Sequence, residues 1–500
     1  MVHIGHAILD SGGNAFDAFV AMVAAENVVA EGASSLAGPL SAVLHDGSNG
    51  EVVYFDADFN DPLSPDWRWH ATMPRDGRSV LVPGAPAGLA ALAETRGTRP
   101  LHQLLEPAIR LATEGFAVSR LMANFITWRA PVLQRTPYGR KTYFSSDGAP
   151  LTTGTTLRLP EVASFLSKLG QLGPSYVYAG DWGARFLESV RADKGVLTEA
   201  DLATYEVYSR KAWTTTYRGY TFHSSSGRCY GGPWTLLALK TLEHMSLPAS
   251  PHYSEDADLL QVLIEIARAV WSESWLLDYR QLDDLDAMAA RLTEAHSREI
   301  WDRVRARVPL RPAVTGGSHS YHIIVVDESG NAVSGTTTIQ SDPWGEGVFV
   351  EGVPLTTAGA VPWSTAPGSR RLAPYSIHLA FRDGLLRFSA GGISNSAVEA
   401  AFQFLVNLID HGLPVEESVS RPRFGTFPDT RRLTLRKNWI DPRVDSAIVR
   451  TLRRRGLRFQ RRGLLDTGLG TVVAALADGR LAGASAPIPY IPDPTSTVPA

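Results

Sequence analysis

SYHIIVVDESGNAVSGTTTIQ, residues 320–340, has the pattern of two β-strands on either side of a short polar loop. The first run is rich in β-branched residues, and the second ends in three threonines, which favour extended structure. The simplest connection is a three-residue loop, Glu328–Gly330, with glycine at the position that commonly needs a left-handed backbone. This stretch therefore predicts an antiparallel β-hairpin.

The register of this hairpin follows if Asp327 faces Asn331. Antiparallel pairing then fixes the partners along it: Val326 with Ala332, His322 with Thr336, and Ser320 with Thr338. The period of two along the second strand places four polar side chains on one face: Ser334, Thr336, Thr338 and Gln340. A β-bulge would change this register.

Ser320 stands at the start of the first strand, directly after residues 306–319 (ARVPLRPAVTGGSH), which contain two prolines and two adjacent glycines without periodicity. We expect that segment to be an exposed, flexible connector. If the His319–Ser320 bond were cut, the new α-amine, with a pKa of about 7.7–8.0, could take the proton from its own side-chain hydroxyl. Ser320 would then supply both nucleophile and base. A polar hairpin at a sheet edge is the alternative interpretation.

The composition predicts a globular protein with a substantial core, since the chain has 500 residues and 44% hydrophobic content. Its 48 basic and 51 acidic side chains leave a formal charge of −3, so we expect neither nucleic acid nor an anionic membrane as partner. The single cysteine, Cys229, excludes an internal disulfide framework. The N-terminus shows no secretory signal pattern, and the longest apolar-rich run, residues 15–30, carries two acidic residues. We therefore expect a cytoplasmic location and no membrane span.

Helical periodicity dominates the first half, whereas strand patterns follow one another after about residue 316, which indicates an α+β protein. No phosphate-binding loop, no G-x-S-x-G elbow and no dinucleotide fingerprint occurs, so no cofactor is implied. His319 and His322 have the spacing of a possible metal pair, but no matching carboxylate stands nearby. We therefore predict no metal site.

Several segments resemble the gamma-glutamyltranspeptidase family. The hairpin is similar to the start of the family's small subunit at Ser320-Tyr321-His322, Gly330-Asn331 and Thr336-Thr337-Thr338, with Gly345 further on. Other segments resemble the family in the same order: SGGNAFDAFVA (11–21), VPGAPAGLAAL (82–92), LLEPAIRLATEGFAVS (104–119), LTEADLATYEV (197–207), APGSRRL (366–372) and GLPVEESVSRPRF (412–424). The resemblance covers nearly the whole chain.

This resemblance implies an N-terminal nucleophile hydrolase fold, a four-layer αββα sandwich made from one self-cleaving precursor. Residues 1–319 would form the large fragment and 320–500 the small one, together one structural unit and a heterodimer that could oligomerise further. Ser320 would attack the His319 carbonyl, and Thr338 would orient the Ser320 hydroxyl. Gly391 and Gly392 resemble the paired glycines whose N–H groups hold the oxyanion.

The sequence departs from the family at the positions that bind glutamate. Asp58 stands where glutamyl-binding members place an arginine that clamps the substrate carboxylate. Ala373 and Pro374 replace a serine pair, and Ala360 or Val361 occupies the place of an aspartate. The expected substrate-binding set is therefore Asp58, Gln340, Thr356, Thr357 and Ala373. Because the charged anchors are altered, we expect little γ-glutamyl transfer.

The leading hypothesis is a self-processing hydrolase of an amide or related acyl bond in a small-molecule substrate that is not γ-glutamyl. The same acyl-enzyme chemistry could cleave a carbon–carbon bond next to a carbonyl, as in secondary-metabolite pathways. A third possibility is a non-catalytic relative that stays one chain and binds a ligand or partner. The substitution of serine for the family's threonine is chemically mild, because both hydroxyls serve as nucleophiles.

Overall fold

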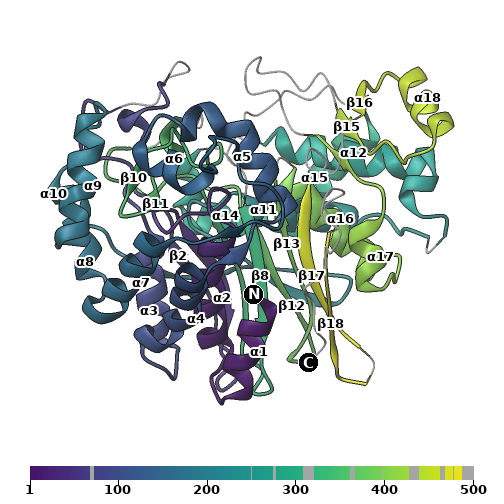
Figure 1. Ribbon diagram of the computed structural model, residues 1–500. Helices are drawn as coiled ribbons and strands as arrows, with labels where there is room; N and C mark the ends of the chain where they lie inside the picture. The colour runs from purple at the N-terminus through teal and green to yellow at the C-terminus, as the bar shows by residue number, and fades with distance from the viewer. Residues whose placement is uncertain are drawn as a thin grey trace.

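The computed structural model describes residues 1–486 except 68–72, 249, 274–277, 308–319, 361–365, 395, 427–437, 462–467 and 477. His319, which forms one side of the predicted cleavage bond, lies outside the described residues. Val361 lies outside them as well. The described chain forms four layers, two stacked antiparallel sheets between two layers of helices (Figure 1). The α+β sandwich expected from the sequence is confirmed.

The first sheet has five strands and contains the hairpin. Its strands, in order across the sheet, are β5 (Tyr208–Lys211), β2 (Val52–Ala57), β1 (Leu40–His45), β9 (Ala332–Thr338) and β8 (Ser320–Val326). Every neighbouring pair is antiparallel. The long parallel crossovers typical of α/β folds are therefore absent from this sheet.

The second sheet has six strands and faces the first. In order they are β18 (Leu481–Ser485), β17 (Leu469–Ala475), β13 (Leu385–Ile393), β12 (Ser376–Arg382), β7 (Tyr220–Ser224) and β6 (Trp213–Tyr217). Strands β8 and β9 contact β13 of this sheet. Residues 1–319 and residues 320–500 each contribute strands to both sheets, so the two predicted fragments share one structural unit.

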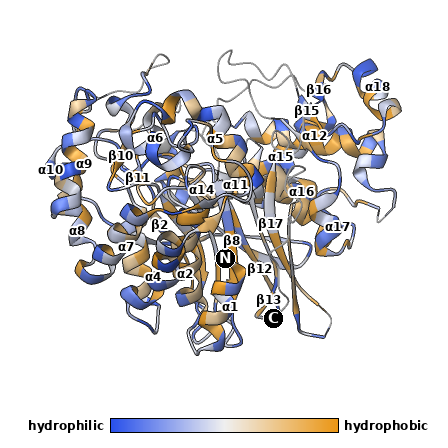
Figure 2. Cartoon of the chain, in the orientation of Figure 1, coloured by the Kyte–Doolittle hydropathy of each residue, from blue (hydrophilic) through white to orange (hydrophobic). Residues whose placement is uncertain are grey.

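Helices cover the outer face of each sheet and bury their apolar sides against it (Figure 2). The helices on the first sheet and behind it are α1 (Val2–Asp10), α2 (Ala15–Val29), α3 (Ala85–Thr95), α4 (Leu101–Glu114) and α7 (Pro160–Leu172). Those on the second sheet and behind it are α11 (Gly231–Leu242), α12 (Ala257–Trp271), α15 (Glu294–Arg305), α16 (Ala397–Ile409) and α17 (Val415–Ser420). The two largest apolar cores lie one between each sheet and its helices, and a smaller cluster that includes Val43, Ile377 and Leu379 lies between the sheets.

Shorter elements complete the described chain. The remaining helices are α5 (Arg120–Leu133), α6 (Pro137–Tyr143), α8 (Ser175–Tyr178), α9 (Asp181–Ala192), α10 (Glu199–Ala203), α13 (Tyr279–Leu282), α14 (Leu285–Arg291) and α18 (Ser446–Arg454). Three small sheets pair β3 (Phe116–Ala117) with β4 (Thr156–Leu157), β10 (Phe349–Val350) with β11 (Val353–Pro354), and β14 (Phe424–Gly425) with β15 (Asn438–Ile440) and β16 (Phe459–Arg461).

The hairpin has the predicted register. Ser320 pairs with Thr338, His322 with Thr336 and Val326 with Ala332, without a bulge. Gly330 takes a φ of +80°, the left-handed conformation that the three-residue loop requires. One expectation fails at the far end, because β9 ends at Thr338 and Gln340 has a φ of +48°. The alternation of faces therefore stops before Gln340.

Asp327 holds the turn of the hairpin through both carboxylate oxygens. Oδ1 accepts hydrogen bonds from the backbone N–H groups of Ser329 and Asn331, both at 3.0 Å. Oδ2 accepts from Asn331 Nδ2 at 2.8 Å and from the N–H of Ala15, the first residue of α2, at 2.9 Å. A carboxylate at a helix N-terminus is also favoured by the helix dipole. Asp327 thus joins the hairpin turn to the helix that covers it.

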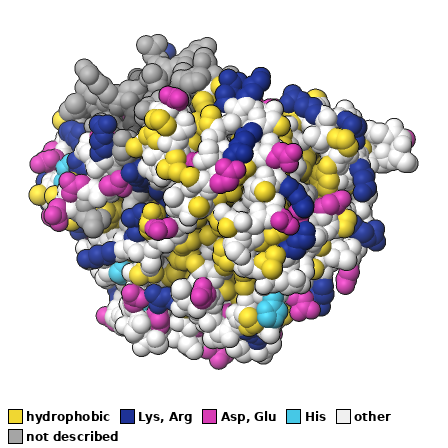
Figure 3. Space-filling model, turned by 90° about the vertical axis from the view of Figure 1, so that its left-hand side faces the viewer, with side chains coloured by type: hydrophobic (Ala, Val, Ile, Leu, Met, Phe, Trp, Pro, Cys, Tyr) yellow, Lys and Arg dark blue, Asp and Glu magenta, His cyan; other side chains and the backbone are white. Residues whose placement is uncertain are grey.

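Charged side chains of both signs lie on the surface of the protein. On the face shown in Figure 3, basic and acidic side chains are interspersed. Among the described residues, no helix is both long and apolar enough to cross a membrane.

Replacing Asp327 with alanine should lower the free energy of unfolding by about 2–3 kcal/mol, because several N–H donors of the turn and of α2 lose a charged acceptor. Urea denaturation followed by circular dichroism measures this change. Glu328→Ala, at the exposed neighbouring position, is the matched control and should leave stability unchanged. Equal stability of the two variants would contradict the role of Asp327.

Candidate active site

Two hydroxyl-bearing residues face each other at the open end of the hairpin, opposite its turn. Ser320 is half-buried and is the first residue of β8, and Thr338 is fully buried and is the last residue of β9. Side chains of directly opposed antiparallel residues lie on the same face of the sheet, with Cβ atoms about 4.5–5.5 Å apart. The two hydroxyl groups are therefore neighbours on one face. Thr338 Oγ1 also accepts the backbone N–H of Gln340 at 2.9 Å.

A chain of polar contacts leads from Thr338 to Asp58. Gln340 is fully buried, and its Nε2 donates to the Tyr375 hydroxyl at 3.3 Å. The Tyr375 hydroxyl also interacts electrostatically with the nearby Asp58 carboxyl group. The structure thus brings together four of the expected site residues: Ser320, Thr338, Gln340 and Asp58. Tyr375, which the sequence did not single out, is the link between them.

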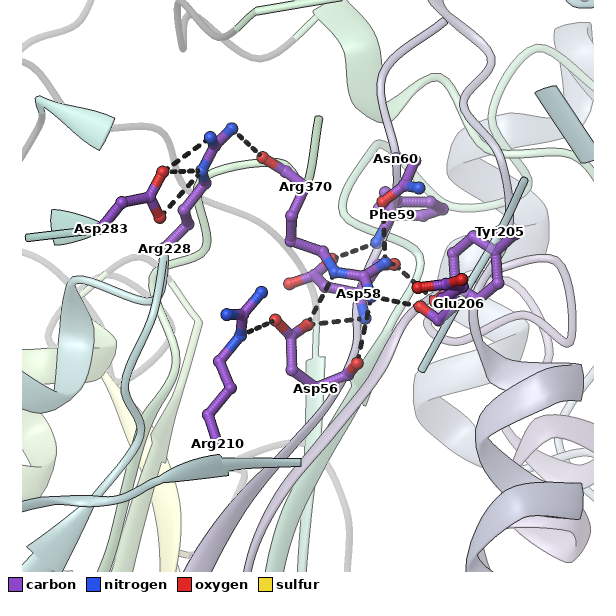
Figure 4. A network of polar contacts seen from close by, with 10 residues as sticks. All are labelled: Asp56, Asp58, Phe59, Asn60, Tyr205, Glu206, Arg210, Arg228, Asp283 and Arg370. Atoms are coloured by element: carbon purple, nitrogen blue, oxygen red, sulfur yellow. Dashed lines mark hydrogen bonds and ion pairs between the residues drawn. The ribbon is translucent and has the colours of Figure 1, made fainter. Parts of the chain in front are cut away.

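Asp58 follows β2 directly and lies beside a buried arginine network (Figure 4). Arg370 Nη1 donates to the Asp58 carbonyl at 2.6 Å, and Tyr205 Oη donates to the same carbonyl at 2.7 Å. The Asp58 side chain accepts the N–H of Phe59 at 2.7 Å. Arg370 therefore binds the main chain at Asp58 rather than its carboxylate.

Two arginines of this network form ion pairs with Asp56 instead. Arg370 Nε lies 3.0 Å from Asp56 Oδ1, and Arg210 Nε lies 3.2 Å from Asp56 Oδ2. Arg370 also donates to Asn60 Oδ1 at 2.8 Å and to the Glu206 carbonyl at 2.6 Å. These contacts occupy the guanidinium group of Arg370 in structural bonds.

Asp58 differs from Asp56 in its electrostatic environment. Burial raises the pKa of Asp58 to about 8, and the nearby negative charge of Asp56 adds to the rise. The hydrogen bond from Phe59 and the positive charge of Arg370 act in the opposite direction but are smaller. Asp58 is therefore largely a neutral carboxylic acid at pH 7.

The neighbouring arginine is also engaged. Arg371 Nη1 forms an ion pair with Asp61 Oδ1 at 2.7 Å, and both side chains are fully buried. Neither guanidinium of the pair 370–371 is thus available to clamp a substrate carboxylate in this conformation.

Gly391 and Gly392 lie in the interior of β13, between β12 and β17. Gly391 is in register with Ile377 and Thr471, and Gly392 with Ser376 and Gly470. They belong to the sheet that faces β8, on the opposite side of the interface between the sheets. Their role in holding an oxyanion stays a prediction.

The other expected substrate residues are buried at two further places. Thr356 and Thr357 follow β11, and Thr357 accepts the N–H of Ala360 at 3.0 Å. Ala373 exchanges backbone hydrogen bonds with Arg228 and Tyr230 and lies two residues from Tyr375. Ala373 is therefore near the polar chain, whereas the contacts of Thr356 and Thr357 do not join them to Ser320 or Asp58. Their place in a substrate pocket stays a prediction.

His322 makes contacts that do not suit a metal ligand. Its Nδ1 lies 2.9 Å from Thr336 Oγ1 and its Nε2 lies 3.0 Å from Ser334 Oγ, so both ring nitrogens are engaged. Within the described ranges, no group of three or more His, Cys, Asp or Glu side chains could hold a metal ion. Cys229 is buried, and its thiol donates to the Tyr375 carbonyl at 3.1 Å, which is a packing role.

One signal in the sequence could have revealed the arginine network. Residues 56–61 contain three aspartates, and residues 370–371 are two adjacent arginines. Buried charges need partners of opposite sign, so these two segments are complementary. Tyr375 has no comparable signal, because an aromatic residue before a strand is ordinary in a core.

Comparison with known proteins agrees with this geometry. The sequence pattern of the family described as gamma-glutamyltranspeptidase matches residues 2–488. The chain belongs to the gamma-glutamyltranspeptidase family. It is therefore an enzyme of the N-terminal nucleophile hydrolase type, as the resemblance of its segments to the family implied.

Curated relatives within this family carry two kinds of name. The chain is 28% identical over 520 residues to the acylase ACY 1 proenzyme of Pseudomonas sp. strain V22, covering 96% of this chain and 89% of that protein. It is 27% identical over 490 residues to the glutathione hydrolase proenzyme of Escherichia coli strain K12, covering 86% and 82%.

Solved structures support the family fold. A cephalosporin acylase from Bacillus halodurans superposes with a TM-score of 0.83 at 22% identity, covering 97% of this chain and 92% of that one. The gamma-glutamyltranspeptidase of Helicobacter pylori superposes with a TM-score of 0.54 at 26% identity, covering 60% of this chain and 88% of that one.

The raised pKa of Asp58 makes stability depend on pH. The folded chain keeps this proton up to about pH 8, whereas the unfolded chain loses it near pH 3.8. Between these values the folded state binds more protons, so its stability falls as pH rises. Asp58→Asn removes this component, and the variant should lose less unfolding free energy than the wild type between pH 5 and pH 8, by an amount on the order of a few kcal/mol. Urea titrations at several pH values measure this.

Asp66→Asn is the control for that experiment, because Asp66 is exposed. The unfolding free energy of this variant should change with pH as that of the wild type does. If Asp58→Asn also matched the wild type, Asp58 would titrate normally in the folded protein.

Proposed function

We propose that this family member is a self-processing acyl hydrolase in which Ser320 becomes the N-terminal nucleophile. The observation that carries the proposal is the pairing of Ser320, at the start of β8, with the buried Thr338. Relatives named as proenzymes, both acylase and glutathione hydrolase, support a maturation step in this chain as well.

In the proposed maturation, Ser320 Oγ attacks the carbonyl carbon of His319. The peptide C–N bond breaks as the C–O bond forms, and the Ser320 nitrogen takes a proton to become an α-amine. Water then hydrolyses the resulting ester, which releases the carboxylate of residue 319 and restores the hydroxyl group. Thr338 Oγ1, one strand away, would orient the Ser320 hydroxyl in this step.

In the proposed substrate reaction, the freed α-amine accepts the proton of Ser320 Oγ as that oxygen attacks an acyl carbon. The proton then passes to the leaving group, and an acyl-enzyme ester forms. Water, activated by the same amine, hydrolyses the ester and regenerates the enzyme. The N–H groups of Gly391 and Gly392 are the proposed donors to the oxyanion.

The surroundings of Asp58 favour a substrate other than a γ-glutamyl compound. A neutral carboxyl group at this position cannot form a charge-assisted clamp with a carboxylate, and its ionised form would repel one. Arg370 and Arg371 are already engaged with Asp56 and Asp61. We therefore propose a small acyl substrate whose recognised end carries hydroxyl or amine donors and no carboxylate.

Self-cleavage should produce two fragments on a denaturing gel, and the smaller should begin Ser320-Tyr321-His322 by N-terminal sequencing. Ser320→Ala should remain a single chain, because it has no nucleophile. Ser329→Ala, in the exposed turn, is the matched control and should cleave like the wild type. A wild-type chain that stays intact under all conditions would favour a non-catalytic binding protein.

The two fragments should remain associated in gel filtration without denaturant, since each contributes strands to both sheets. Their separation would show that cleavage destroys the fold.

γ-Glutamyl-4-nitroanilide should be a poor substrate for the cleaved protein, with a kcat/KM at least about a hundredfold below that of Escherichia coli glutathione hydrolase assayed in parallel, the size of a lost charge-assisted clamp. Release of nitroaniline measures the rate. Comparable turnover by the two enzymes would refute the interpretation of Asp58. A substrate that the enzyme cuts at a carbon–carbon bond next to a carbonyl would instead identify the second reaction type.

A further inference from the structure

His322 lies between the two sheets, two residues after the proposed nucleophile. It is a residue of β8 whose ring is buried and bonded to β9 through Thr336 and Ser334. Burial lowers the pKa of His322 to about 3, so the imidazole is neutral throughout the physiological range. Ser389 of β13 lies 3.1 Å from Ser334, which extends the contacts into the second sheet.

The hydrogen bonds of this group hold the His322 ring in place. Ser389 Oγ donates to the His378 carbonyl at 2.8 Å, because a carbonyl can only accept. Ser389 Oγ also lies 3.1 Å from Ser334 Oγ, which in turn lies 3.0 Å from His322 Nε2. His322 Nδ1 lies 2.9 Å from Thr336 Oγ1. Both ring nitrogens therefore have a buried hydroxyl partner on β9, and these two contacts fix the orientation of the ring.

The fixed ring occupies the space above Gly391. A Cβ atom built on Gly391 would lie 2.1 Å from both Cε1 and Nε2 of His322, a distance that no side chain tolerates. Thr471, which is paired with Gly391, donates its hydroxyl to the His322 carbonyl at 3.4 Å. Ring and main chain of His322 therefore both contact the Gly391 region.

We propose that His322 is a positioning residue whose ring sets the separation of the Ser320 strand from the Gly391–Gly392 strand, an inference that rests on the proposed roles of Ser320 and these glycines. A nucleophile and its oxyanion donors come from different sheets here, so something must fix the gap between the sheets. The imidazole is a rigid spacer for this purpose, because its orientation is held on one side and its face meets a residue without a side chain on the other.

The test uses complementary changes in volume. Gly391→Ala should slow acylation of Ser320 by about 100-fold, the cost of a displacement near 1 Å. His322→Asn in the same chain should recover about tenfold of that loss, because the shorter amide makes room for the methyl group and still reaches Thr336. His322→Asn alone should be slow as well, since the spacer is shortened.

The readout is labelling of the small fragment by 4-nitrophenyl acetate, followed by mass spectrometry on self-cleaved protein, with the melting temperature measured for each variant. His378→Asn is the matched control. His378 is a second buried imidazole, on the face of β12 that packs against α11, and its Nε2 contacts Ser376 rather than Gly391. That variant should lose stability and label at the wild-type rate.

Wild-type labelling by Gly391→Ala, or a double variant no faster than Gly391→Ala, would overturn the positioning role. Labelling rates that follow melting temperature in all variants, including His378→Asn, would overturn it too. A wild-type protein that neither cleaves nor labels at Ser320 would reject the proposed function itself, and with it the role of His322.

Discussion

The pairing of β8 with β9 is the constraint on which the rest of the site depends. Asp327 fixes the turn, and the turn fixes the register in which Ser320 faces Thr338. A slip of one residue would turn every side chain of β8 to the other face. His322 would then point toward the helices, and both the nucleophile pair and the contact with Gly391 would be lost. Turn chemistry far from Ser320 thus decides whether the proposed chemistry is possible.

Electrostatics in this protein is local, because buried charges are neutralised where they stand. Arg370 and Arg371 pair with Asp56 and Asp61, and Arg370 also binds carbonyl groups from distant segments. Buried ion pairs of this kind are costly to disrupt, since one partner left alone would be an uncompensated charge. The network therefore fixes the segment that carries Asp58 while leaving the Asp58 carboxyl group without a cationic partner. Its raised pKa is a consequence of this division of roles.

The two sheets make self-cleavage compatible with a stable fold. Each predicted fragment supplies strands to both sheets, so cutting one connector would remove no strand pairing between them. Between the sheets, neutral hydroxyl and imidazole groups satisfy one another without net charge. Such a layer is specific in geometry because hydrogen bonds are directional, which is the property that a site assembled from two sheets needs.

The sequence by itself determined the hairpin, its register, the facing hydroxyl residues and the α+β class, because turn residues and strand periodicity act between near neighbours in the chain. It also contained the complementary charges of residues 56–61 and 370–371, although not their pairing. Only the tertiary structure decided that Tyr375 joins Asp58 to Gln340, that Arg370 binds a carbonyl 312 residues away, and that His322 fills the space over Gly391. These contacts depend on how the sheets and loops pack in three dimensions, and no local pattern in the chain specifies that packing.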